Sequence, residues 1–188
     1  MPIHKANDLP AIRRYITTHS AEGEAVFLSQ SLIPEFIPSH TAGQDGEISM
    51  LYVTVTNPVS VDDELDVAAY DDYLHLSPGL TTSQGSVMRI IDLRPSKVTP
   101  MHRTVSLDYV VVLEGDIDLV LDSGQSRILH RGDVIVQRGT AHSFRNRSSN
   151  SWCRLLFVFL PLNEIVIKGK AMESEEYKEN YESDSQSQ

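Results

Sequence analysis

Cysteine is almost absent from this sequence. Among its 188 residues the single cysteine is Cys153, so the chain can form no internal disulfide bond, and a zinc site built from several thiolates is excluded. Cys153 lies within the apolar run 152–160. This position indicates a buried structural thiol.

Basic residues and long apolar runs are also scarce. The 16 Lys and Arg against 26 Asp and Glu give a formal net charge of −10, which repels nucleic-acid phosphates and anionic lipid. We therefore expect neither nucleic acid nor a membrane as a partner. No stretch approaches the roughly 20 apolar residues of a membrane helix, and residues 1–20 lack the apolar core of a signal peptide. These features favour a cytoplasmic location.

Three common catalytic motifs are missing as well. The sequence contains no glycine-rich phosphate loop, no Gly-x-Ser-x-Gly elbow and no His-Glu-x-x-His pair. Nucleotide binding, serine hydrolysis and zincin-type proteolysis therefore have no support.

Short β-type segments separated by turn residues dominate what is present. Hydrophobic residues make up 40% of the chain, which is enough for one core. The segments that read as strands are 48–56, 86–93, 108–114, 117–122, 126–130, 134–138, 141–145 and 152–160. Because no long helices are available for a parallel sheet, this pattern predicts an all-β sandwich or barrel.

The remaining regions carry other signals. Residues 8–15 predict a short helix, and residues 16–29 predict a hairpin at the edge of the sheet. Residues 30–46 and the acidic stretch 59–80 show no clear period, so we expect surface loops that fold over the mouth of the barrel. A further edge strand is expected at 165–168.

The C-terminal end is polar, acidic and poor in aliphatic residues, so we expect it to be disordered. We therefore divide the chain into an N-terminal extension (1–47), a barrel (48–163) and a polar acidic tail (164–188). Two histidines, His102 and His142, lie in separate strand-like segments of the barrel region. Curling the strands into a small barrel would bring them together.

The residues around these histidines resemble the two motifs of the cupin superfamily. The matching segments are Pro100-Met-His102, Asp108-Tyr-Val-Val-Val-Leu-Glu-Gly115, Gly132-Asp133 and Gly139-Thr-Ala-His142-Ser-Phe-Arg-Asn146. In cupins, three histidines and a glutamate hold a metal inside an antiparallel jelly-roll barrel. The resemblance implies a single cupin barrel, also called a double-stranded β-helix.

The sequence departs from the cupin pattern at several positions. Thr104 stands where the second histidine belongs, Asp108 replaces the glutamate, Ser96 replaces a glycine and Gln137 replaces a proline. As a result, only three residues of the motif remain as candidate metal ligands and catalytic groups. They are His102, Asp108 and His142.

Two interpretations of these three residues stay open. Two imidazoles and one carboxylate resemble the facial set that holds non-haem Fe(II), and zinc accepts the same ligands. In the alternative the metal has been lost, and His102, Asp108 and His142 form an acid/base cluster for proton transfer. Asp108 has a further reading, as a strand-start residue that accepts hydrogen bonds from nearby backbone N–H groups.

Two polar residues are candidate substrate contacts. Thr104 alternates with His102 on a strand-like period, so its hydroxyl can bond a substrate oxygen. Arg89 lies in an apolar strand, where its guanidinium can bind a carboxylate. The alternative for Arg89 is a structural ion pair with Asp92 or Asp108.

Three aromatic residues complete the candidate binding set. Tyr109, Phe144 and Tyr52 can line a pocket for a flat or apolar substrate. Aromatic residues in strands are also ordinary core or wall residues, because β-strands favour them.

Nearly the whole chain is similar to small single-domain cupins, among them cupin-domain oxidoreductases of fungal pathways to salicylaldehyde-type products. This resemblance implies an enzyme that transforms a polyketide-derived intermediate, by oxidation or by dehydration, isomerisation or decarboxylation. The alternative is a non-catalytic cupin that binds a small aromatic or acidic ligand for partner enzymes. Because cupins commonly pair through edge strands, we expect a homodimer.

Overall fold

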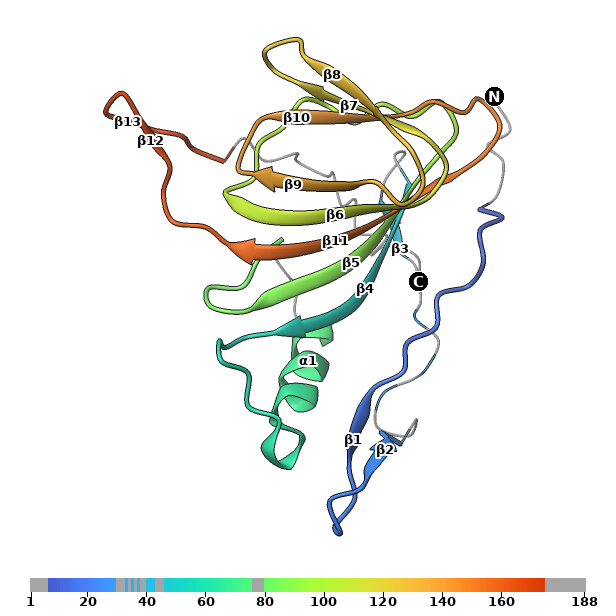
Figure 1. Cartoon of the computed structure of the whole chain (residues 1–188), viewed down its shortest axis with the longest axis vertical. Helices are drawn as coiled ribbons and strands as arrows, with labels where there is room; N and C mark the ends of the chain where they lie inside the picture. The colour runs from blue at the N-terminus through green and yellow to red at the C-terminus, as the bar shows by residue number, and fades with distance from the viewer. Residues whose placement is uncertain are drawn as a thin grey trace, which may run out of the picture.

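The computed structural model of the chain describes residues 7–29, 33, 35, 37, 40–42, 46–75 and 80–174. Most of the regular structure in these residues is β-strand, and the strands curl into a barrel made of two sheets (Figure 1). The expected all-β jelly-roll barrel is confirmed.

The larger sheet contains six antiparallel strands in the order β3-β4-β5-β11-β6-β9. These strands are β3 (His40–Ala42), β4 (Gly46–Thr54), β5 (Ser86–Leu93), β11 (Cys153–Pro161), β6 (Ser106–Glu114) and β9 (Val134–Arg138). The smaller sheet has the order β10-β7-β8. Its strands are β10 (His142–Asn146), β7 (Ile117–Leu121) and β8 (Ser126–Leu129). In the larger sheet β11 lies between β5 and β6 (Figure 1), so the last long strand of the chain is an inner strand of this sheet.

Each strand expected between residues 48 and 160 is present, with its ends shifted by no more than two residues. The inward-facing side chains alternate with outward-facing ones, as a strand requires. On β11, Leu155 lies opposite Val112 and Phe157 lies opposite Val110, and all four are buried. Cys153 is also buried, as expected, and burial raises the pKa of its thiol to about 12.

The helix expected at residues 8–15 is wrong, because this segment is extended. Asp92 and Arg154 form a buried ion pair on the face of the sheet opposite Leu155, with hydrogen bonds of 2.7 and 2.6 Å. Arg154 also donates to the carbonyl of Pro10 at 2.7 Å. This long-range partner uses a carbonyl that a helix would use itself, so tertiary contacts override the local preference.

The hairpin expected within residues 16–29 is confirmed. It consists of β1 (Thr17–His19) and β2 (Ala25–Phe27), which pair antiparallel. Gly23 has a φ of 81°, a left-handed conformation that glycine adopts without strain. The hairpin projects away from the barrel next to helix α1 (Leu65–His75) (Figure 1).

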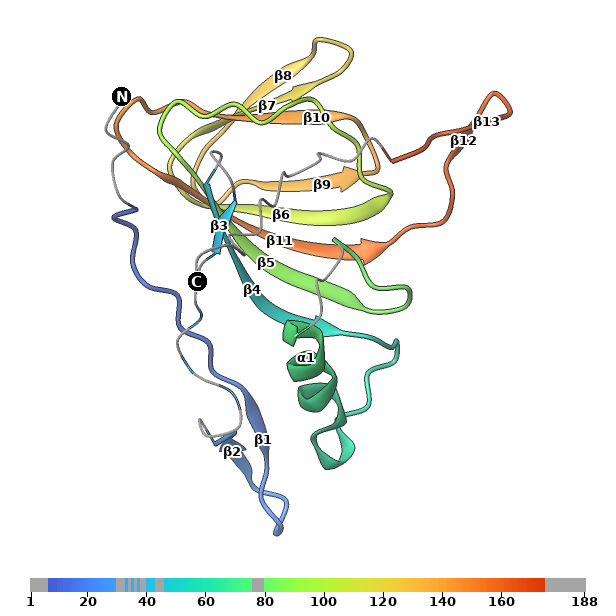
Figure 2. The ribbon, with the colours of Figure 1, turned by 180° about the vertical axis from the view of Figure 1, so that it is seen from behind.

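The surface loop expected at 59–80 is also wrong in part, because it contains η1 (Asp62–Glu64) and α1. Helix α1 lies against β4 (Figure 2). The hydroxyl of Tyr70 donates to the carbonyl of Met50 at 3.2 Å, and the hydroxyl of Tyr52 donates to Asp66 at 2.6 Å. The apolar residues of α1 follow only a weak helical period, so its stability comes from these tertiary contacts and left little signal in the sequence.

Three predicted segments lie partly or wholly outside the described residues or close to their ends. Most of the expected loop 30–46 lies outside the described residues, although β3 within it pairs with β4. Residues near 165–168 form a small hairpin of β12 (Val166–Ile167) and β13 (Lys170–Ala171). Residues 175–188 lie outside the described part, so the disordered tail and the three-part division of the chain stay predictions. In the described part, no helix is long and apolar enough to cross a membrane.

Candidate functional site

The two motif histidines meet, as the sequence predicted. His142 begins β10, and His102 lies in the segment that leads into β6. Their backbones form an antiparallel bridge with two hydrogen bonds, of 3.0 and 2.9 Å. The centroids of the two imidazole rings are 4.4 Å apart, with an angle of 50° between the ring planes. The strand pairing therefore places two imidazoles in direct contact.

Both imidazoles are anchored through Nδ1. Nδ1 of His102 lies 2.9 Å from the carbonyl oxygen of Pro100, and Nδ1 of His142 lies 2.9 Å from that of Thr140. Burial and, to a smaller extent, the neighbouring His102 lower the pKa of His142 to about 4, and the Thr140 carbonyl partly opposes both effects. His142 is therefore neutral at pH 7 and can accept a proton.

Asp108 is a buried carboxyl group on the inner face of β6. It is 1% exposed, and Ser106, two residues earlier on the same face, is completely buried. In the described chain neither Oδ1 of Asp108 nor Oγ of Ser106 has a hydrogen-bond partner. Burial raises the pKa of Asp108 to about 6, and the nearby Ser106 hydroxyl opposes this effect without reaching hydrogen-bond geometry. Buried polar atoms normally find partners, so this pair is suited to a ligand group.

The structure does not assemble the three expected metal ligands into one cluster. Among the described residues, no group of three or more His, Cys, Asp or Glu side chains could hold a metal ion. The opposite Cα partner of Asp108 on β9 is Gln137, and Gln137 contacts His142. Gln137 therefore links the strand that carries Asp108 to His142, and the described residues do not fit a three-ligand metal site.

Phe144 and Arg89 extend the site along the barrel interior. The Phe144 ring lies 5.1 Å from the His142 ring and 5.9 Å from the Phe157 ring, and Phe157 stacks on Phe159 at 5.4 Å. The guanidinium carbon of Arg89, a buried residue, lies 6.0 Å from the centre of the Phe159 ring. A row of aromatic rings therefore runs from the histidine pair to a cation.

Arg89 does not pair with Asp92, one of its two expected structural partners. Asp92 binds Arg154 instead, in the buried pair on the opposite face of the sheet. Thr104, the remaining polar candidate, is buried next to the first histidine motif at 7% exposure. Its role as a substrate contact stays a prediction.

Two of the expected pocket residues do not face the interior. Tyr109 is 44% exposed on β6, where its neighbour Asp108 is buried. Consecutive residues of a strand point to opposite faces, so the two side chains cannot both point inward. Tyr52 contacts α1, with its hydroxyl on Asp66 and its ring 4.8 Å from that of Tyr70. Burial, together with Asp66, raises the pKa of the Tyr52 hydroxyl. Tyr52 therefore supports the helix.

Gln137 is a site residue that sequence reasoning did not include. Its amide nitrogen lies 3.0 Å from Nδ1 of His142 and 3.0 Å from the Thr140 carbonyl oxygen. Residues of β9 alternate between exposed and buried, with Ile135 and Gln137 buried. The sequence of β9 does not show this alternation, because the exposed Val134 and Val136 are as apolar as the buried Ile135. The one available signal was that Gln137 replaces the proline of the cupin-like motif.

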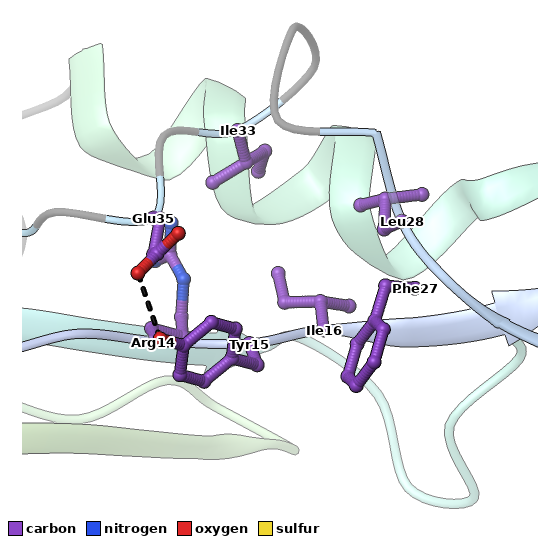
Figure 3. Close-up of a pocket in the computed structure, with 7 residues that line it drawn as sticks. All are labelled: Arg14, Tyr15, Ile16, Phe27, Leu28, Ile33 and Glu35. Atoms are coloured by element: carbon purple, nitrogen blue, oxygen red, sulfur yellow. Dashed lines mark hydrogen bonds between the residues drawn. The ribbon is translucent and has the colours of Figure 1, made fainter.

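A cavity of about 190 Å³ lies elsewhere, between the N-terminal segment and the hairpin (Figure 3). Its lining residues are Arg14, Tyr15, Ile16, Phe27, Leu28, Ile33 and Glu35. None of the expected site residues lines it. The cavity therefore belongs to the packing of the N-terminal extension and not to the histidine site.

Comparisons with known proteins agree with the fold and the motif. Residues 89–159 match the model of the family described as "Cupin domain". Phomopsin biosynthesis cluster protein C' of Diaporthe leptostromiformis is 47% identical over 165 residues, covering 88% of this chain and 86% of that protein. The cupin-domain-containing oxidoreductase fogC of Aspergillus ruber is 40% identical over 173 residues, covering 90% of this chain and 82% of that protein.

A solved structure shows a more distant similarity. The polyketide cyclase RemF of Streptomyces resistomycificus is 19% identical, with a TM-score of 0.46, and the match covers 78% of this chain and 85% of that one. The sequence relatives are far closer, and they align over most of both chains. This protein therefore belongs to the cupin-domain family.

Proposed function

We propose that this protein is a cupin enzyme of secondary metabolism that transforms a small polyketide-derived molecule. The observation that carries the proposal is the pair of contacting imidazoles, His102 and His142, in the same barrel as the buried carboxyl group of Asp108, whose Oδ1 has no hydrogen-bond partner among the described residues. Titratable groups that converge inside a barrel serve chemistry more often than packing. The names of the relatives support the biosynthetic setting, since one belongs to phomopsin biosynthesis and another is an oxidoreductase.

The two kinds of titratable group suit proton transfer. His142, neutral at pH 7, can remove a proton from a carbon atom next to a carbonyl group. Asp108, whose pKa of about 6 keeps a fraction of the carboxyl groups protonated near neutral pH, can in that form donate a proton to a departing hydroxyl group, which then leaves as water. Exchange with solvent returns both groups to their starting states. The same acid/base pair would serve an isomerisation or a decarboxylation, whereas an oxidation would require an electron acceptor.

A divalent metal, Fe or Zn, belongs to the proposal only with fewer protein ligands than the three that the sequence suggested. His102 and His142 would supply two imidazole nitrogens, and other donors would have to complete the coordination. A bound metal would polarise a substrate carbonyl group. Metal analysis of protein purified without a metal-affinity tag tests this part, because stoichiometric Fe or Zn would support it and a metal-free, active protein would remove it.

A second candidate function is non-catalytic binding of a small aromatic or acidic ligand. The observation that favours it is the interior row of Phe144, Phe157 and Phe159, which ends at the buried Arg89 guanidinium. Aromatic rings and a guanidinium are suited to a flat ligand that carries a carboxylate. Under either function the proposed partner is a small molecule, the proposed location is the cytoplasm and the proposed assembly is a homodimer.

The substitution His142→Ala distinguishes the catalytic function from the non-catalytic binding function. In a host that carries the biosynthetic pathway, we expect the variant to lose the product that the wild-type protein forms, as measured by mass spectrometry of culture extracts. His130→Ala is the matched control, because the His130 side chain is 66% exposed and contacts Asp116 on the surface. Unchanged product with His142→Ala would leave the binding function.

A further inference from the structure

The inner face of β6 changes from polar to apolar along the strand. Four of its side chains are at most 1% exposed, and they share this face: Ser106, Asp108, Val110 and Val112. On the neighbouring strand β9, the buried Gln137 lies opposite Asp108. The buried Ile135 lies opposite Val110. The interior wall of the barrel therefore has a polar end and an apolar end.

Ser106 and Asp108, at the polar end, carry buried polar atoms that the fold does not use. Among the described residues, neither Oγ of Ser106 nor Oδ1 of Asp108 has a hydrogen-bond partner. Ser143 shows the usual situation, since its buried hydroxyl donates to the carbonyl oxygen of Thr99 at 2.6 Å. Because unpartnered buried polar atoms destabilise a fold, the two atoms on β6 are suited to a ligand.

The chemistry of the two atoms indicates which ligand group fits. A carboxylate oxygen only accepts hydrogen bonds, whereas a serine hydroxyl donates one. Ser106 and Asp108 are two residues apart on one face, about 7 Å along the strand, so a small group can lie between their side chains. A ligand hydroxyl group can donate to Oδ1 and accept from Oγ–H. A carbonyl oxygen cannot donate to the carboxylate, and a methyl group can do neither.

A flat apolar surface adjoins these polar atoms. Phe159 of β11 is the Cα partner of Asp108 on the other side of β6, and it is 4% exposed. Its ring stacks on that of Phe157, with 5.4 Å between the centroids and 7° between the planes. Aromatic side chains at this place favour a ligand whose hydroxyl group is attached to a flat, apolar part.

We propose that Ser106 and Asp108 form a subsite for the hydroxyl group of a flat, largely apolar substrate, and that Ser106 selects hydroxylated substrates over their deoxy analogues. This inference rests on the proposed function, because the hydroxyl group bound here is the one that would leave as water. It favours dehydration of a hydroxylated intermediate over isomerisation or decarboxylation.

Benzyl alcohol and ethylbenzene are matched probes, because they differ only by a hydroxyl group in place of a methyl group. Titrations at pH 8, followed by NMR of the backbone amides, measure both dissociation constants. Ser106→Ala should weaken the binding of benzyl alcohol about fivefold, the effect of one hydrogen bond, and leave that of ethylbenzene unchanged. Asp108→Leu should weaken benzyl alcohol about tenfold, because hydrogen bonds to charged groups are stronger. Ser126→Ala, at an exposed position of β8, is the control and should change neither.

Stability separates a ligand subsite from a structural role. Urea denaturation of the free protein should give Ser106→Ala a midpoint equal to or above that of the wild-type protein, because its hydroxyl has no partner to lose. Ser143→Ala should lower the midpoint, because it removes the hydrogen bond to Thr99. An equal loss in the two variants would show a structural role for Ser106 and overturn the proposal.

Three other results would also overturn it. They are the absence of benzyl alcohol binding to the wild-type protein, equal weakening of both probes by Ser106→Ala, and a larger effect of the two substitutions on benzylamine, which would assign the subsite to an ammonium group. The expected binding results together with product formation unaffected by His142→Ala would keep the subsite and remove the catalytic function. Loss of product with His142→Ala but no effect of Ser106→Ala on binding would remove the subsite alone.

Discussion

Two buried aspartates of the same barrel show how a residue's partners decide its role. Asp92 accepts two hydrogen bonds from Arg154, of 2.7 and 2.6 Å, and one from Asn7 of 2.9 Å. Asp108 is equally buried, but its Oδ1 has no partner among the described residues. The charge of Asp92 is therefore compensated inside the fold, whereas the charge of Asp108 is left for a ligand or a proton.

The substitution of each aspartate by asparagine should have opposite effects. Asp92→Asn leaves Arg154 as a buried charge without its carboxylate, so we expect a loss of about 3–5 kcal/mol in the free energy of unfolding at pH 8. Asp108→Asn removes a buried charge whose Oδ1 has no hydrogen-bond partner among the described residues, so this variant should be at least as stable as the wild-type protein. Urea denaturation at pH 8 measures both. A loss with Asp108→Asn as large as that with Asp92→Asn would contradict the prediction.

Asp108 and His142 should make opposite contributions to the pH dependence of stability. The pKa of Asp108 rises from 3.8 to about 6 on folding, so the folded state holds this proton more tightly and the contribution of Asp108 decreases as the pH rises through 6. The pKa of His142 falls from 6.5 to about 4, so its contribution increases with pH over the window from 4 to 6.5. In the wild-type protein the two trends oppose each other.

Asp108→Asn should therefore make stability increase with pH between 4 and 6, by up to about 3 kcal/mol from the His142 shift. His142→Asn should make stability decrease over the same window. Urea denaturation at several pH values measures both slopes, and equal slopes in the two variants would contradict the assignment.

At the scale of elements, β4 receives hydrogen bonds from outside the sheet where its own pairing is irregular. Its pairing with β5 is irregular between Met50 and Tyr52. The Met50 carbonyl accepts a hydrogen bond from Tyr70 of α1 at 3.2 Å, and the Leu51 carbonyl accepts one from Arg14 at 2.7 Å. The helix and the N-terminal segment thus donate hydrogen bonds to carbonyl groups at the irregular point of this pairing.

The start of β5 approaches β4 so closely that only glycine fits. A Cβ on Gly85 would lie 1.7 Å from the carbonyl oxygen of Thr54. Gly85→Ala should therefore separate the two strands and lower the free energy of unfolding by more than about 3 kcal/mol. Gly124→Ala is the control, because nothing lies within 4 Å there and only its φ of 82° opposes alanine, which should cost about 1 kcal/mol. Thermal denaturation compares them, and equal losses would contradict the steric explanation.

At the scale of the whole molecule, the outer face of the larger sheet carries exposed apolar side chains. Val134 and Val136 of β9 are 63% and 54% exposed, and Tyr109 of β6, the cross-strand partner of Val136, is 44% exposed. Exposed apolar patches of this kind mark interaction surfaces. An uncharged patch is complementary to itself, so a second copy can cover it despite the net charge of −10 of each chain.

The double substitution Val134→Lys with Val136→Lys tests this assembly. We expect light scattering to give the mass of two chains for the wild-type protein and of one chain for the variant, with the same circular dichroism spectrum. Val166→Lys is the control, since Val166 is 56% exposed on the small β12–β13 hairpin. A wild-type mass of one chain at working concentration would refute the homodimer.

The sequence alone was sufficient for the barrel and for the meeting of His102 with His142. Strand-forming segments bounded by turn residues give local signals, and the two histidine motifs fix which strands must pair. The expectation that Tyr109 lines the pocket was wrong, and the sequence already opposed it, because neighbouring strand residues such as Asp108 and Tyr109 face opposite sides. The period of the side chains determined these features.

Only the tertiary structure decided which residues distant in the sequence contact one another. Residues 8–15 are extended and α1 is helical because contacts with distant residues, Arg154 and Met50 among them, outweigh weak local preferences. The placement of Asp108 opposite Gln137 and of Gln137 against Thr140 depends on the register of β6 with β9 and on the turn into β10. Local sequence signals set the strands, whereas distances between side chains depend on how the strands pair and on which charges they bury.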